Sequence, residues 1–124
     1  MNRRFHGLLL ATILTVVPYA GAAVQGNQVT ITGWVVDSAC AYTKGIEKPV
    51  SEACARACAK NGSPLVLLGD DSTIFIPISD HTPATSQNAK LLPYAGKRVT
   101  ITGKDYVRNG SHGLVVEKIA KSVQ

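Results

Sequence analysis

Three cysteines constrain this chain more than any other feature of its sequence. Cys40 follows a strand-like run, and Cys54 and Cys58 are four residues apart, which is about one helical turn. An odd number of cysteines in an exported domain leaves two arrangements open. One is a disulfide with a leftover thiol, and the other is a thiolate site that holds a ligand. We expect Cys40 to lie near the face that carries Cys54 and Cys58, since a bridge between Cys54 and Cys58 themselves would distort the helix.

The N-terminal segment has the pattern of an export signal. Two arginines precede an apolar stretch, 7–17, that is too short to span a bilayer, and small residues follow at 20–22. We expect residues 1–22 to be a signal peptide and residues 23–124 to form a single OB-like domain. The mature protein would be periplasmic or secreted, with no membrane span after signal cleavage.

The charge of the mature chain argues against nucleic-acid binding. Loss of the two signal arginines lowers the formal net charge from +5 to +3, and no run of Lys or Arg remains. The aromatic residues are scattered, whereas single-stranded nucleic acids are usually bound by stacked aromatics in a basic groove. We expect a metal ion or a protein as the partner instead.

Five segments have the alternating or continuous apolar pattern of β-strands, and turn residues separate them. They are residues 29–36, 65–69, 73–78, 99–107 and 113–119. Asn109-Gly110 is a strong hairpin signal between the last two. The sequence Val-Thr-Ile-Thr-Gly occurs at both 29–33 and 99–103, which indicates two similar strands with one buried face each.

The order of these segments predicts an all-β fold with a small helical insert. A cysteine-bearing helix is expected over 51–60, between strands one and two, because Ser51 can cap it and Asn61-Gly62 can end it. A short helical turn is expected over 88–95. Five strands of this kind suit a five-stranded OB-like barrel.

Three sequence patterns resemble a family of small exported bacterial proteins with OB-like folds. The patterns are Asp-Ser-x-Cys at 37–40, Cys-Ala-x-x-Cys-Ala-Lys-x-Gly-x-Pro at 54–64, and Leu-Pro-Tyr-Ala-Gly-Lys at 92–97. Members often carry a histidine two residues before the Cys-Ala-x-x-Cys segment, where this chain has Glu52. The resemblance implies the fold and the place of a site, but it implies no activity.

Thiolate chemistry is the main candidate function. Cys54 and Cys58 share a helix face, and Cys40 can approach them from the end of strand one. Three thiolates suit Cu(I) or Zn(II), and Asp37 could supply a fourth donor to zinc. The sequence therefore predicts an exported, non-enzymatic metal-binding protein that uses Cys40, Cys54, Cys58 and Asp37.

The alternative is a disulfide between Cys40 and either Cys54 or Cys58. Such a bridge closes a loop of about 15 to 19 residues and stabilises a small secreted domain by roughly 3 kcal/mol. The protein would then be a binding or interaction module, or a subunit of an envelope complex. Arg108 and His112 of the last hairpin would be its ligand-contact residues, by analogy with OB-folds.

The sequence offers little support for an enzyme. It contains no phosphate-cradling glycine loop, no Ser-His-Asp arrangement with motif support and no acid pair that suggests hydrolysis. We therefore expect no catalytic residues.

Overall fold

The computed structural model describes residues 23–45 and 50–122. The predicted signal peptide, 1–22, lies outside the described residues. Within the described ranges, no helix is both long enough and apolar enough to cross a membrane.

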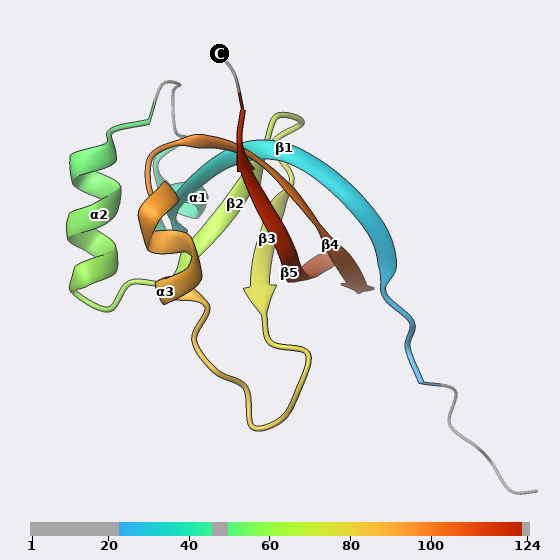
Figure 1. Cartoon of the computed structure of the whole chain (residues 1–124). Coiled ribbons are helices and arrows are strands. Elements are labelled where there is room, and N and C mark those ends of the chain that lie inside the picture. Colours follow the sequence, from blue (N-terminus) through green and yellow to red (C-terminus); the bar gives the residue numbers. More distant parts are fainter. Residues whose placement is uncertain (1–22, 46–49, 123–124) are drawn as a thin grey trace, which may run out of the picture.

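Strands form most of the described chain, with short helices between them (Figure 1). In chain order the elements are β1 (Asn27–Asp37), α1 (Ser38–Thr43), α2 (Glu52–Lys60), β2 (Leu65–Gly69), β3 (Ile74–Ile78), α3 (Asn88–Leu91), the 3-10 helix η1 (Leu92–Tyr94), β4 (Arg98–Arg108) and β5 (Ser111–Lys121).

The five strands close into a barrel in the order β1-β2-β3-β5-β4. The contact between β3 and β5 is parallel, and the other four neighbouring pairs are antiparallel. This arrangement confirms the predicted five-stranded OB-like barrel with a helical insert between strands one and two. Closure also pairs each strand on both sides, which removes exposed sheet edges.

The repeated pentapeptide pairs with its own copy. In the antiparallel register of β1 and β4, Val29 lies opposite Gly103, Ile31 opposite Ile101, and Gly33 opposite Val99. The two copies are therefore related by an approximate twofold axis through the Ile31–Ile101 pair. The repeat forms the central part of the pairing between β1 and β4.

The barrel interior is filled by alternate residues of the strands. The side chains of Val35, Leu67, Ile101 and Leu114 are 0% exposed. Burial of one such side chain stabilises the folded chain by roughly 1.5–3 kcal/mol. Leu91 of α3 and two alanines of α2 belong to the same apolar cluster, so both helices pack against the barrel core. Figure 1 shows α2 and α3 next to each other on one side of the barrel.

A second apolar cluster covers the opposite face of β1 and β2. It contains Trp34, Val36, Val66 and Leu68, with Val50 and two other partly buried residues packed on it. Trp34 is 7% exposed, so it is a packing residue as the sequence indicates. The C-terminal half of β1 is consequently buried on both faces, up to and including Asp37.

The helical insert differs from the prediction in one respect. Helix α2 covers nearly the predicted range, with Ser51 as its N-cap. The six-residue helix α1, which immediately follows β1 and contains Cys40, was not predicted. Its shortness explains the omission, because six residues contain too little periodic pattern to identify a helix.

Candidate functional site

Asp37 anchors the region that carries the cysteines. It is the last residue of β1, it is 4% exposed, and it is the N-cap of α1. Its Oδ1 accepts a hydrogen bond of 2.9 Å from the backbone N–H of Cys40. This bond satisfies one of the free N–H groups at the start of the helix and fixes the position of Cys40 relative to the barrel.

The second carboxylate oxygen of Asp37 has a different environment. Oδ2 is buried, and no hydrogen-bond partner is found for it among the described residues. Burial opposes the charged form, but the Ser63 hydroxyl and the Cys40 backbone and thiol outweigh it, so the pKa of Asp37 lies below its usual range. A negatively charged oxygen is therefore buried beside the thiol of Cys40.

The loop after α2 holds Ser63 near this carboxylate. The Asn88 side chain bridges two chain segments, because its Oδ1 accepts from Leu65 N–H at 2.9 Å and its Nδ2 donates to the Ser63 carbonyl at 2.7 Å. The Ser38 N–H also donates to the carbonyl of Pro64 at 2.9 Å. These bonds connect the start of α1 to the end of the α2 loop.

Helix α2 positions the other two cysteines. Its buried face consists of Ala55 and Ala59, which pack into the barrel core. Cys58 is adjacent to that face and half-buried, whereas Cys54 is exposed in the first turn. The N–H of Cys54 donates to the Ser51 Oγ at 3.3 Å, which completes the N-cap.

The three thiols lie in one neighbourhood with the Asp37 carboxylate. The pKa of Cys40 is raised, first by burial, then by Asp37 and more weakly by Cys54. The pKa of Cys58 is raised by burial, by Asp37 and by Cys54, and the positive charge of Lys44 opposes the rise at both thiols. Asp37 at the end of β1, Cys40 on α1 and the two cysteines of α2 thus lie within electrostatic range of one another.

All three cysteines are present as free thiols. Within residues 23–45 and 50–122, no group of three or more His, Cys, Asp or Glu side chains is arranged so that it could hold a metal ion. The donor types fit a soft or borderline ion, and Oδ2 of Asp37 is a buried donor with no partner.

A second polar pair occupies another part of the barrel. Asp105 on β4 is 7% exposed, and its Oδ2 lies 2.7 Å from Nδ1 of His112 on β5. The Phe75 ring contacts the imidazole edge-on, with 5.0 Å between ring centroids. Asp105 lies at an even spacing along β4 from Val99 and Ile101, which face the barrel interior. The alternation in the sequence therefore indicates that this aspartate is buried.

The last hairpin, which carries His112, lies beside helix α1 at the surface. A surface cavity of about 490 Å³ is lined by Tyr42 of α1 and by residues of the β2–β3 turn, β3 and the β4–β5 hairpin, including His112. Arg108, the last residue of β4, is exposed and does not line this cavity. The cavity thus places His112 of the last hairpin beside Tyr42 of α1, and ligand contact by Arg108 and His112 stays a prediction.

Comparisons with known proteins gave no match to a protein-family model, to a curated protein or to a solved structure.

Proposed function

We propose that this is an exported metal-binding protein whose site consists of Cys40, Cys54, Cys58 and Asp37. The ion would be Cu(I) or Zn(II), with zinc the better match because a carboxylate oxygen can be its fourth ligand. The observation that carries the proposal is the buried Oδ2 of Asp37, which has no hydrogen-bond partner in the described chain and belongs to the carboxylate whose charge raises the pKa of Cys40 and Cys58.

The electrostatics of the site favour a cation. Burial and the Asp37 carboxylate raise the pKa of Cys40 and Cys58, and this effect outweighs the opposing charge of Lys44, so the protonated thiols are favoured until a cation binds. A bound cation reverses this situation because it stabilises thiolates and carboxylate together. Protons compete with the ion for the thiols because their pKa values are raised. The affinity for the metal ion should therefore increase with pH across the neutral and mildly alkaline range.

Native mass spectrometry of the full chain, produced with its own leader and reduced, tests the proposal. The wild type should retain one zinc or copper ion, and Cys40→Ser, Cys54→Ser and Cys58→Ser should each bind it far more weakly. Ser38→Ala is a suitable control, because this residue also lies beside Asp37 but supplies no donor to the set. A reduced wild type that binds neither ion would refute the metal site.

The second candidate function is the disulfide-stabilised interaction module. The cavity lined by Tyr42 and His112 supports it, because this cavity joins the cysteine-bearing connection to the last hairpin. The oxidised protein would then contain a bridge from Cys40 to Cys54 or Cys58. Peptide mapping should find that bridge, and removal of either bridged cysteine should cost about 2–5 kcal/mol. The remaining cysteine should be replaceable with little effect, whereas the metal site requires all three.

A further inference from the structure

The surface cavity that joins α1 to the last hairpin, here called the Tyr42 cavity, has an uncharged lining. Its volume of about 490 Å³ lies within the ~300–1,000 Å³ range of ligand sites in proteins. None of the described residues that line it is Lys, Arg, Asp or Glu. Two other surface cavities are lined by charged side chains, including Lys90 in one and Lys121 in the other. The Tyr42 cavity is therefore a poor match for a nucleic acid or another ionic ligand and favours a neutral one.

Two exposed apolar side chains line the Tyr42 cavity. Tyr42 is 65% exposed and Ile76 is 41% exposed. An exposed tyrosine offers an apolar ring face together with a polar hydroxyl at its tip. The face of a sugar ring is rich in C–H groups that pack against such a ring, while the sugar hydroxyls point outward from the ring edge.

His112 supplies a hydrogen-bonding nitrogen whose orientation is fixed. Its Nδ1 lies 2.7 Å from Oδ2 of Asp105, and the Phe75 ring contacts the imidazole edge-on. A carboxylate only accepts hydrogen bonds, so Nδ1 carries the hydrogen and the lone pair of the neutral ring is on Nε2. The side chain of His112 is 28% exposed and that of Asp105 is 9% exposed, and His112 lines the cavity. Nε2 is therefore the nitrogen left to accept a hydrogen bond from a ligand hydroxyl.

The two turns beside the cavity add polar side chains at unusual backbone angles. Ser72 and Asn109 are the two non-glycine residues with positive φ among the described residues, at +72° and +47°, and both line the cavity. Asparagine is common at such a position in a hairpin, whereas serine is uncommon and glycine would avoid the strain. Both side chains donate and accept hydrogen bonds, as sugar hydroxyls do.

We propose that the Tyr42 cavity is a binding site for a neutral saccharide. Tyr42 packs against one face of a sugar ring, and the hydroxyls of that ring form hydrogen bonds with Nε2 of His112 and with Asn109 and Ser72. The inference does not depend on the metal site, because no cysteine is among the described residues that line this cavity.

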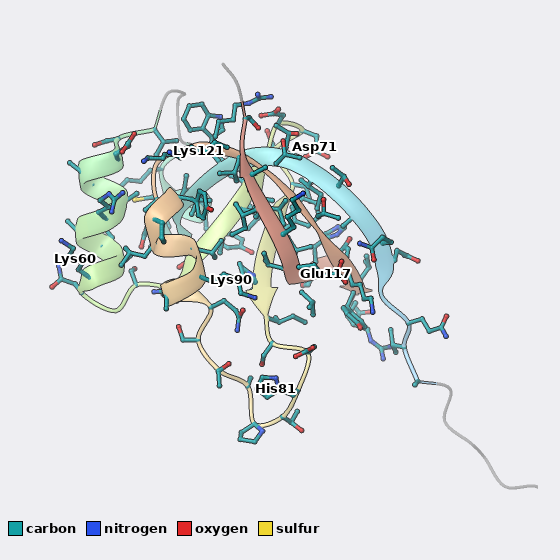
Figure 2. All side chains as sticks on the ribbon, viewed as in Figure 1. Lys60, Asp71, His81, Lys90, Glu117 and Lys121 are labelled. Carbon is teal, nitrogen blue, oxygen red and sulfur yellow. The ribbon has the colours of Figure 1, made fainter. Side chains whose placement is uncertain are left out.

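Calorimetric titration and NMR of the reduced, metal-free full chain test this site, with maltotriose, cellotriose and triacetylchitotriose as the probes. At least one of them should bind at millimolar concentration or below, and its affinity should change little between low and high salt. The Nε2 signal of His112 should shift on binding. His81 is the internal control, because its Nδ1 also lies close to a carboxylate, 3.0 Å from Asp80, but its loop extends away from the barrel (Figure 2).

Three variants locate the binding surface. Tyr42→Ala should weaken binding about tenfold, because it removes the aromatic face. Asn109→Gly should weaken binding about fivefold, because it removes the amide and leaves a residue that suits positive φ. His81→Ala should leave the affinity unchanged, because it removes an imidazole that does not line this cavity.

The opposite results would overturn the proposal. It is wrong if none of the three saccharides binds, or if binding leaves the Nε2 signal of His112 in place. Equal affinities of the wild type and Tyr42→Ala would also contradict it. Tighter binding of a thymidine oligonucleotide, lost at high salt, would replace the saccharide with a nucleic acid as the ligand.

Discussion

Substitution of Asp37 separates its two roles, as helix cap and as metal donor. Asp37→Ala removes the acceptor of the Cys40 N–H bond and should lower the free energy of unfolding by about 0.5–2 kcal/mol, the usual effect of losing an N-cap. Asp37→Asn keeps an acceptor oxygen at that position but removes the charge. It should therefore recover at least half of the loss seen with alanine.

The acid dependence of stability provides a second part of the same prediction. The pKa of Asp37 is lower in the folded chain than the unfolded value of 3.8. The ionised carboxylate consequently contributes stability that is present above the unfolded pKa and disappears as the pH falls through the folded pKa. The difference between wild type and Asp37→Asn should shrink over that acidic window.

Urea denaturation of the reduced, metal-free full chain measures both effects, and a zinc titration measures the second role. Asp37→Asn should bind zinc more weakly although it is folded. Ser51→Ala is the matched control, because it removes the N-cap bond of the cysteine-bearing helix α2 and removes no donor. If Asn destabilises the protein as much as Ala, the cap argument is wrong. If Asp37→Asn binds zinc like the wild type, Asp37 is not a ligand.

Three further predictions concern the scaffold, and chemical denaturation tests each of them. Gly96 has φ +76°, and an added Cβ would lie 2.4 Å from a backbone Cα of α2, so Gly96→Ala should destabilise by more than Gly110→Ala. Gly110 has φ +80° but open space around it, so Gly110→Ala should lower the free energy of unfolding by only about 1–2 kcal/mol. Equal destabilisation by the two substitutions would contradict the close approach of Gly96 to α2. Because the pKa values of Cys40 and Cys58 are raised above the ordinary thiol value of 9.0, the stability of the reduced apoprotein should fall as the pH rises above 9.0. A variant with serine in place of both Cys40 and Cys58 should lose that part of the pH dependence. His112→Ala should cost about 1–3 kcal/mol, because it leaves the buried carboxylate of Asp105 without its 2.7 Å partner. His112→Ala should destabilise the Asp105→Asn variant less than it destabilises the wild type. If it lowers the free energy of unfolding equally in both, the two residues are not coupled.

The strand framework was predictable because its signals are local. Period-two alternation in β4 places Val99 and Ile101 inside the barrel, and the Asn109-Gly110 hairpin fixes the register with β5. The parallel contact between β3 and β5 that closes the barrel has no such local signal. It depends on a long connection and on packing around α3, and the sequence supported it only through the general pattern of the OB-fold.

The candidate site was predictable in its composition but not in its detail. The helical spacing of Cys54 and Cys58 and the position of Asp37 before Cys40 follow directly from the sequence. The unpaired Oδ2 of Asp37 could not be foreseen, because it results from burial between two packed segments. The bond between Asp105 and His112 was also missed, since it joins two strands across a hairpin and depends on which side chain faces inward.

The repeat that pairs with its own copy has a consequence for the behaviour of two molecules. Residues 29–33 and 99–103 have the same sequence and pair with each other in the antiparallel direction. Each segment can therefore also pair with the same segment of a second molecule. If β1 separates from β4, it therefore meets an equivalent partner in β1 of a second molecule. Local opening between β1 and β4 then offers a route to strand exchange between chains. In the exchanged pair, Ile31 would lie opposite Ile31 of the second molecule, where it lies opposite Ile101 in the single chain. In a background with serine at positions 40, 54 and 58, Ile31→Cys would report such pairing as a covalent dimer after partial unfolding and oxidation, and a purely monomeric product would exclude it.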